Sequence, residues 1–406
     1  MTEMFLSEFI DFNPTVRLPK GTVASFVPMD SVIPWYRDVV ATESKPYTGG
    51  TKFLDGDILL ARITPSLENG KTSIYRAAES SRSKPAFGST EFIVARGIEG
   101  ISDTEYIYYL LRTDQMRSVA IASMTGSSGR QRVQLGTLES TLWDLPDLVE
   151  QRQIATTLGV LDDKIESNQK QVSLLEEILV AYFQKQFALN HRNGGRERVI
   201  NLPIRVTDYV ANGSFKTLKE NVTLSEGSGY ATFIRNTDLK NGFFSKSVDQ
   251  KSYEFLAKTK LFGGEVIISN VGDVGSVYLC PKLESRMTLG NNILLVKSES
   301  ELFSNAFLYC YFRYGVGSEQ IKSITGGSAQ PKFNKTDFRN LEMELYDEIF
   351  FAEFNRIAAT IINHKDHLYR QNYELTQLRD AILPELMSGR IRVPEAREAI
   401  DQEAGL

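Results

Sequence analysis

Two long segments of the chain carry apolar residues at alternating steps of four and three positions. The first runs from Gln153 to Gln184, and its series is interrupted by the polar Asn168. The second begins about two hundred residues later and has Gln371 at the corresponding position. This spacing predicts two helices that pair lengthwise, because a heptad pattern places its apolar residues along one face.

The shared polar position indicates that the two helices arose by duplication. Polar residues in a coiled-coil interface usually specify register, so we expect Asn168 and Gln371 in the same or adjacent layers of an antiparallel pair. The predicted interface residues are Ile154, Leu158, Leu161, Ile165, Asn168, Val172, Leu175 and Leu179 in the first helix, and Ile357, Ile361, His364, Leu368, Gln371, Leu375, Leu378 and Ile382 in the second.

The segments that precede the two helices resemble each other in the same order. Each has a short apolar stretch near its start, from Ala24 and from Ala231. Each then has a glycine turn that leads into a β-branched strand and a polar loop, from Phe53 and from Leu261. A further strand, helical stretches with aromatic residues and a Gly-rich loop follow in both segments, which is typical of mixed α and β structure.

The sequence therefore predicts an α+β protein with a pseudo-twofold internal duplication. We expect two similar mixed α/β domains separated by two long helices that form an antiparallel coiled coil. The predicted boundaries are 1–146 for the first domain, 147–192 for the central helix, 193–346 for the second domain, and 347–406 for the C-terminal helix and tail. A coiled coil of about 29 residues would span roughly 40 Å, comparable to one turn of B-DNA.

Local signals mark the ends of the predicted helices. Asp147, with Glu150 three residues later, is typical of a helix start capped by Asp147. The second helix meets Pro384, which should kink or end it near Leu383. The charged tail after Arg392 is expected to fray.

Composition restricts the class of protein. A chain of 406 residues with 42% hydrophobic and 24% charged residues is expected to fold into two or more domains. It has no run of eighteen apolar residues for a membrane span, and its acidic start is unlike a secretion signal. Cys280 and Cys310, the two cysteines, favour a reducing cytoplasm over a disulfide framework.

Motifs for catalysis are missing from the sequence. The string closest to an adenine methyltransferase tetrapeptide, Asn13 to Val16, lacks the second proline and the aromatic residue. The glycines between Tyr314 and Ser318 follow a helical stretch rather than a strand, so they indicate a helix end. His364 and His367 have no cysteine or carboxylate cluster that would complete a metal site. We therefore expect no catalytic residue, no cofactor and no metal in this chain.

A family resemblance rests on the order domain, helix, domain, helix and on two stretches of sequence. These stretches are the helix entry from Pro146 (PDLVEQRQIA) and the segment from Leu378 (LRDAILPELMSGRI). The chain resembles the specificity subunit of type I restriction-modification systems. The resemblance implies that each domain is a target recognition domain for one half of a split site in double-stranded DNA. It also implies that the coiled coil sets the spacer and docks two adenine-N6 methyltransferase subunits, where S-adenosylmethionine is expected, and that an ATP-dependent endonuclease subunit can join.

This sequence departs from the family pattern in the second helix. Its entry, YDEIFFAEFNRIA, lacks the proline and the Glu-Gln pair of the first helix. His364 is expected at an interface position that Leu161 holds in the first helix. These differences predict unequal docking surfaces for the partner subunits.

The Gly-rich loops before the two helices are the first candidates for DNA contact. Glycines let backbone N–H groups approach a phosphate, and glutamine and arginine can pair with adenine and guanine in the major groove. The candidates are Thr125, Ser127, Ser128, Arg130, Gln131 and Arg132 in the first loop, and Thr325, Ser328, Gln330 and Lys332 in the second. Either loop alone could be an exposed turn, but its recurrence in both copies favours a site.

The loops after the paired strands are the second candidates. Arg62, Asn69, Lys71 and Asn270 are the polar side chains there that can reach bases or phosphates, and Arg235 is a weaker candidate. Each of these could equally be an ordinary surface residue. The net charge of −5 argues on average against DNA, so basic side chains must be segregated or supplied by a partner. The alternative function is a coiled-coil interaction scaffold without sequence-specific DNA binding.

Overall fold

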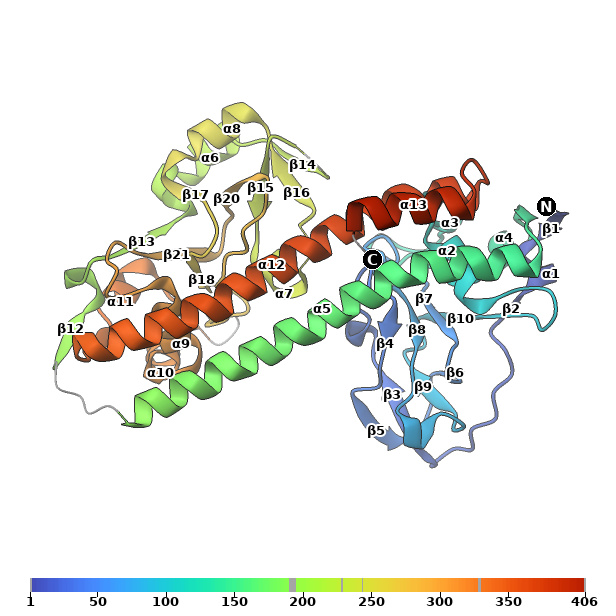
Figure 1. Ribbon diagram of the computed structural model, residues 1–406, viewed down its shortest axis with the longest axis horizontal. Coiled ribbons are helices and arrows are strands. Elements are labelled where there is room, and N and C mark those ends of the chain that lie inside the picture. Colours follow the sequence, from blue (N-terminus) through green and yellow to red (C-terminus); the bar gives the residue numbers. More distant parts are fainter. Residues whose placement is uncertain (1, 190–194, 228, 243, 328–329, 405–406) are drawn as a thin grey trace. The chain divides into compact units, whose positions relative to one another are not determined.

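The structure, a computed structural model, describes residues 2–189, 195–227, 229–242, 244–327 and 330–404 (Figure 1). The chain forms two compact units. Unit 1 comprises Met1–Glu166 and Tyr373–Leu406, and unit 2 comprises Ser167–Asn372. Each unit therefore contains part of α5 (Leu148–Leu189) and part of α12 (Glu348–Met387). The expected boundary between residues 192 and 193 lies outside the described residues.

The residues of unit 1 that the structure describes form three sheets. The first has the order β2 (Ile10–Phe12), β10 (Phe92–Gly97), β7 (Ile58–Ala61), β8 (Thr72–Tyr75) and β4 (Asp38–Val39). The second has the order β5 (Glu43–Pro46), β3 (Val23–Val27), β9 (Ala86–Gly88) and β6 (Thr51–Phe53), and the third pairs β1 (Thr2–Phe5) with β11 (Leu142–Leu145). The shorter helices of this unit are α1 (Leu6–Phe9), α2 (Thr104–Arg112), α3 (Asp114–Ala122), α4 (Leu135–Glu139) and α13 (Val393–Ala404).

The described residues of unit 2 also form three sheets. The first has the order β13 (Ile204–Asp208), β21 (Ile293–Ser298), β18 (Val266–Ser269) and β19 (Val277–Leu279). The second has the order β14 (Leu224–Glu226), β16 (Lys246–Val248), β15 (Ala231–Ile234), β20 (Arg286–Leu289) and β17 (Lys260–Leu261), and the third pairs β12 (Arg196–Arg198) with β22 (Glu342–Glu344). Its shorter helices are α6 (Phe215–Asn221), α7 (Asn236–Asn241), α8 (Gln250–Phe255), α9 (Asn305–Tyr314), α10 (Val316–Ser323) and α11 (Lys335–Arg339).

The two units repeat one topology, which confirms the predicted duplication. The strand order β2-β10-β7-β8 of unit 1 has its counterpart in β13-β21-β18-β19 of unit 2. In the second sheets, β3 pairs with β9 in parallel as β15 does with β20, and β6 and β17 add to them antiparallel. In each unit two helices then follow the last long strand, α2 and α3 or α9 and α10, and a short helix leads into the next strand.

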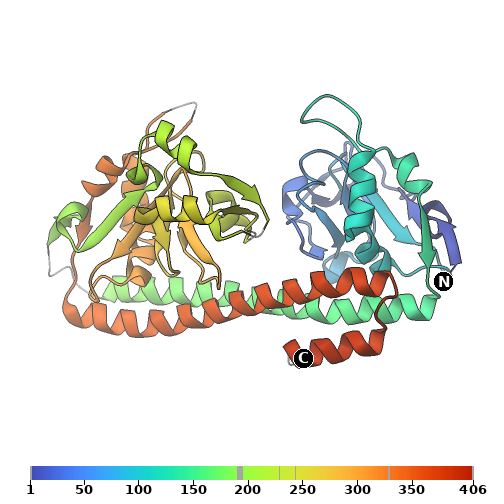
Figure 2. The ribbon, with the colours of Figure 1, turned by 90° about the horizontal axis from the view of Figure 1, so that it is seen from above.

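The helices α5 and α12 run side by side in opposite directions (Figures 1 and 2). In unit 1, Leu158 and Leu161 of α5 lie in one core with Leu375 and Ile382 of α12. In unit 2, farther along α5, the ring of Tyr182 stacks on Phe354, which comes earlier in α12. Within unit 2, Asn168 contacts Gln371, Glu176 contacts Lys365, and Tyr182 contacts Phe354. Partners on α12 therefore have lower numbers as α5 proceeds, so the pair is antiparallel there, as the heptad spacing predicts.

The polar layer of the coiled coil lies where the sequence places it. Asn168 is fully buried, and its Nδ2 donates hydrogen bonds of 2.8 Å to Gln371 Oε1 and to Asn372 Oδ1. The expected shared layer of Asn168 and Gln371 is thus confirmed. The start of α5 is confirmed as well, since Asp147 Oδ1 accepts hydrogen bonds of 2.9 Å from the backbone N–H groups of Val149 and Glu150.

One predicted interface position is wrong. The side chain of His364 is exposed, and the next residue, Lys365, is turned inward with 7% exposure. Lys365 is held there by an ion pair with Glu176 of α5. A long aliphatic stem can be buried while the ammonium group reaches an acid, so a charged residue takes the position that periodicity assigned to the histidine.

The second helix does not end near Leu383, whereas the alternative of a kink there stays a prediction. The described part of the tail is helical, so the expectation that it frays is wrong. Pro384 lies inside α12, which continues to Met387. A proline removes one backbone hydrogen bond, but Leu383, Leu386 and Met387 are buried in the core of unit 1 and stabilise the last turn. After it, α13 buries Ala396 and Ile400 in the same core. No helix in the described part of the chain is long and apolar enough to cross a membrane.

Candidate nucleic-acid interface

In each unit the structure joins the two predicted DNA-contact loops into one surface. In unit 1 a β-bridge links Ile63 to Arg132, and the backbone N–H of Thr64 donates to Gln131 O at 3.0 Å. In unit 2 a β-bridge links Val271 to Lys332. We call residues 62–71 with 125–132 loop pair 1, and residues 270–276 with 325–332 loop pair 2. Ser328 of loop pair 2 lies outside the described residues.

The two Gly-rich loops are closed by similar backbone pairs, which differ by one residue at the first position. The backbones of Thr125 and Arg132 exchange two hydrogen bonds of 3.1 and 2.9 Å, and those of Gly326 and Lys332 exchange two of 2.9 Å. Gly327 has a φ of +97°, and a Cβ built there would lie 2.8 Å from the carbonyl oxygen of Gln330. The tight turn therefore requires glycine at this position, because a side chain would clash with the opposite strand of the hairpin.

Polar side chains of both Gly-rich loops are exposed to solvent. Ser127, Ser128 and Arg130 are exposed in loop pair 1, and Gln330 and Lys332 are exposed in loop pair 2. Among the residues that the structure describes, the side chains of Arg130 and Lys332 have no hydrogen bond or ion pair to another residue. Their charges are thus available to an external anion such as a DNA phosphate.

Glu91 lies outside loop pair 1 but contacts it, and the sequence reasoning missed this residue. Its carboxylate accepts hydrogen bonds from Arg132 Nη2 at 2.6 Å and Nε at 2.9 Å. The hydrogen bonds from Arg132 lower the pKa of Glu91, against the smaller opposing effect of burial. The equivalent residue of loop pair 2 is Asn292, since the backbone carbonyl oxygens of Glu91 and Asn292 accept from Arg62 and Asn270 respectively. A negative charge therefore lies beside loop pair 1 where loop pair 2 has a neutral amide.

Three of the other candidates make hydrogen bonds within the fold. Lys71 Nζ donates to the carbonyl oxygen of Met29 at 2.9 Å, and burial lowers the pKa of Lys71. The guanidinium of Arg235 holds Asp238 through hydrogen bonds of 2.6 and 2.9 Å at the start of α7. Thr325 Oγ1 donates to the carbonyl oxygen of Ile321 at 2.8 Å. These contacts give each side chain a structural role that is independent of DNA.

The remaining candidates lie on the loop surface or near it. Asn69 is exposed. Asn270 Nδ2 donates to the carbonyl oxygen of Phe333 at 3.4 Å, while its Oδ1 is buried and has no partner among the described residues. The hydroxyl of Thr125 accepts a hydrogen bond of 2.6 Å from Gln134. The Nε of Arg62 is likewise buried without a partner in the described part of the chain. The contact of any of these side chains with DNA stays a prediction.

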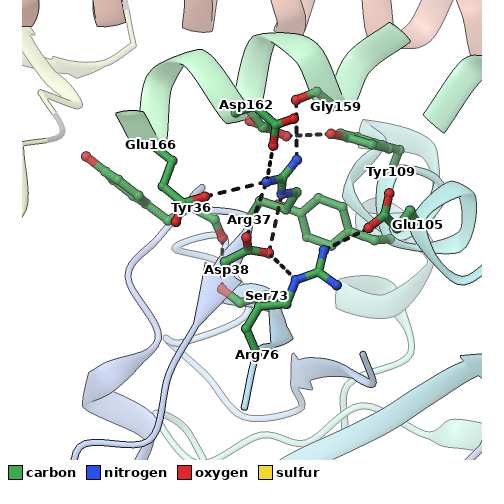
Figure 3. Close-up of polar contacts among 12 residues, drawn as sticks. Tyr36, Arg37, Asp38, Ser73, Arg76, Glu105, Tyr109, Gly159, Asp162 and Glu166 are labelled. Atoms are coloured by element: carbon green, nitrogen blue, oxygen red, sulfur yellow. Dashed lines mark hydrogen bonds and ion pairs between the residues drawn. The ribbon is translucent and has the colours of Figure 1, made fainter. Parts of the chain in front are cut away.

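A network of charged residues fastens the domain of unit 1 to α5 (Figure 3). Arg37 Nη1 donates to the carbonyl oxygen of Gly159 on α5 at 3.3 Å, and Nη2 contacts Asp163 at 2.5 Å. Asp38 binds both Arg37 and Arg76, and Arg76 reaches Glu105 of α2 at 2.7 Å. The network orients the domain on the helix, so the loop pair of this unit sits on a rigid support.

A buried acid, Asp162, links the domain to α12, and its contact with Tyr109 is drawn in Figure 3. Asp162 Oδ2 accepts a hydrogen bond of 2.6 Å from the hydroxyl of Tyr109, and its Oδ1 accepts one of 2.6 Å from Arg379 of α12. Burial alone would raise the pKa of Asp162, but the charges of Arg379 and Arg112 and the hydrogen bonds outweigh burial and lower this pKa. The carboxylate is therefore ionised inside the core, where it ties three elements together.

Comparison with known proteins matches most of the chain to one family. The family model described as "Type I restriction modification DNA specificity domain" matches residues 28–177 and again residues 208–345. The specificity subunit of the type I restriction enzyme MjaIX of Methanocaldococcus jannaschii is 24% identical over 310 residues, which are 72% of this chain and 70% of that protein. The specificity subunit of the enzyme EcoEI of Escherichia coli is 32% identical over 161 residues, 38% of this chain and 27% of that protein.

Solved structures of similar proteins cover nearly the whole chain. An S subunit of a type I restriction-modification system from M. genitalium has a TM-score of 0.48 and 13% identity, and the match covers 95% of each chain. The HsdS subunit from Thermoanaerobacter tengcongensis has a TM-score of 0.36 and 17% identity, and the match covers 96% of this chain and 97% of that one.

Proposed function

The chain belongs to the type I restriction-modification DNA specificity family, and we propose that each of its two loop pairs reads one half of a bipartite DNA target. As a specificity subunit it is not itself the catalyst. The observation that supports this division of the target is that both units form the same kind of surface from two loops. In each unit an equivalent β-bridge joins the loops, Ile63 to Arg132 and Val271 to Lys332. A scaffold that recognised no DNA sequence would have no need of a duplicated polar surface.

The loop pairs combine the two kinds of contact that DNA recognition needs. Backbone N–H groups at the glycine turns and the charges of Arg130 and Lys332 suit phosphates, which position a protein on DNA. The amides of Gln131 and Gln330 suit adenine, and the guanidinium of Arg130 suits guanine, both in the major groove. Because Glu91 neutralises Arg132 whereas Asn292 leaves Lys332 uncompensated, we expect the two half-sites to differ.

Partner subunits complete the assembly that we propose. With a net charge of −5 the chain has limited electrostatic attraction for DNA as a whole, so a basic partner would add affinity. The proposed partners are two adenine methyltransferase subunits docked on α5 and α12, which would bind S-adenosylmethionine, and an ATP-dependent endonuclease subunit. The expected location, a reducing cytoplasm, stays a prediction that rests on the two buried cysteines Cys280 and Cys310.

Replacing the two free cations tests the loop pairs. Arg130→Ala and Lys332→Ala should each weaken binding to the DNA target by the complex with its methyltransferase partner. The slope of log K against log salt should become shallower by about one for each lost phosphate contact. Lys20→Ala, which removes an exposed charge outside the loop pairs and the two long helices, is the matched control and should leave the slope unchanged. Unaltered affinity and slope in both loop variants would exclude these loops from the site.

Mapping of N6-methyladenine tests the division of the target. A chain whose loop pair 1 is replaced by that of a relative should change one half of the methylated motif and leave the other half intact. A change in both halves would contradict reading by separate domains.

A further inference from the structure

The coiled coil contains a buried ion pair in unit 1. Arg379 Nη1 of α12 contacts Asp162 Oδ1 of α5 at 2.6 Å, and the two side chains are 2% and 3% exposed. A second cation, Arg112 of α2, lies 4.0 Å from the same carboxylate. Removing one partner of such a pair leaves an uncompensated charge in the core, so this contact constrains which helix can face which.

Unit 2 contains a second pair of the same kind. Lys365 of α12 forms an ion pair with Glu176 of α5, and the two side chains are 9% and 19% exposed. Glu176 also accepts hydrogen bonds from the hydroxyls of Tyr309 and Tyr314. Both helices therefore bring one charged residue into the interface in each unit, and α5 supplies the acid each time.

The duplication relates these two ion pairs to each other. Asn168 of α5 corresponds to Gln371 of α12, a step of 203 positions. The same step takes Asp162 to Lys365 and Glu176 to Arg379. At each of the two equivalent layers, an acid of α5 therefore faces a base of α12. The helices have the same apolar spacing but opposite charges at the charged positions.

We propose that α5 and α12 are complementary but not self-complementary surfaces, so that each helix accepts only the other as its antiparallel partner. In a pair of two α5 helices at this register, Asp162 would face Glu176, and in a pair of two α12 helices, Lys365 would face Arg379. Like charges in a buried interface disfavour both pairings. Two copies of this chain can therefore pair through these helices only if α5 of one copy packs against α12 of the other. This inference does not depend on the proposed reading of DNA.

Charge reversal in the full-length chain tests the proposal. An acidic variant, Lys365→Glu with Arg379→Glu, places acids on both helices, and a basic variant, Asp162→Lys with Glu176→Lys, places bases on both. Each variant alone should have a Tm lower than that of the original chain by roughly 5–10 °C. When the two are refolded together, each acidic helix should pair with a basic one, and light scattering should find a complex of two chains, twice the 45.7 kDa of one.

Two controls separate pairing specificity from a general loss of folding. The chain with all four substitutions again has opposite charges across the two helices, so it should be a monomer with a Tm above that of either twofold variant. Its Tm should stay below that of the original chain, because Asp162→Lys places a second cation near Arg112. Arg356→Glu with Arg370→Glu makes the same change in charge at exposed positions of α12 and should leave the Tm nearly unchanged. The proposal is overturned if the acidic and basic variants keep the original Tm, or if their mixture forms no two-chain complex while the fourfold variant folds.

Discussion

Replacing Asn168 with leucine is expected to stabilise the helix pair of unit 2. Asn168 has 0% exposure, and its Nδ2 donates two hydrogen bonds of 2.8 Å, to Gln371 and Asn372. Its Oδ1, however, is buried and has no hydrogen-bond partner among the residues that the structure describes. The side chain therefore combines two favourable contacts with one unfavourable burial.

The magnitude follows from these contacts. A buried acceptor without a partner costs roughly 1–3 kcal/mol, which offsets most of the about 0.5–1.5 kcal/mol that each hydrogen bond contributes. A buried leucine side chain would contribute about 1.5–3 kcal/mol. Gln371 and Asn372 are only half-buried, so water can replace the donor that they lose. We expect a net gain in the free energy of unfolding of about 1–2 kcal/mol.

Thermal unfolding followed by circular dichroism measures this gain. For a unit of this size the Tm should rise by roughly 3–6 °C. Ser173→Leu places the same side chain at an exposed position of α5 and should change stability by less than about 0.5 kcal/mol. A fall in the Tm of the Asn168→Leu chain would refute the reasoning, because it would mean that the polar layer stabilises the pair more than apolar packing can.

Two further predictions concern α12 and its partner. Pro384→Ala restores a backbone N–H inside α12 and should raise the free energy of unfolding, measured in urea, by about 1–3 kcal/mol. An unchanged urea midpoint would show that the helix is already distorted there for another reason. The pKa of Asp162 lies below its ordinary 3.8, so this group stabilises the fold above that pH, and the contribution is lost as pH falls through the lower folded-state value. Asp162→Asn should therefore lower the Tm at pH 7 and make the Tm less dependent on pH below 3.8. If the Tm of the Asp162→Asn chain and of the original chain fell equally with pH, the stabilising role of the ionised Asp162 would be contradicted.

Much of the architecture could be predicted from the order of residues alone. Heptad spacing predicted both long helices, because helical periodicity is a local property. The polar residue that interrupts both heptad series predicted that Asn168 lies beside Gln371. The repeated glycine turns and β-branched stretches identified two similar domains for the same reason. The Asp147 cap also needed only a few neighbouring residues.

Tertiary structure decided the contacts between residues far apart in the chain. The burial of Lys365 in place of His364 depends on Glu176, which lies on another helix and is held by Tyr309 of a third element. The helical tail is ordered because Ile400 and its neighbours reach the core of unit 1.

The two candidate loop sets also became one surface only in the fold, since the bridge from Ile63 to Arg132 spans a long stretch of sequence. Glu91 was missed for the same reason, because its partner Arg132 is 41 residues away. Periodicity reports which face of an element is apolar, but it carries no information on which distant charge will compensate a buried one. That choice depends on the packing of the elements against each other, because a buried charge is stable only where a partner lies within hydrogen-bond distance.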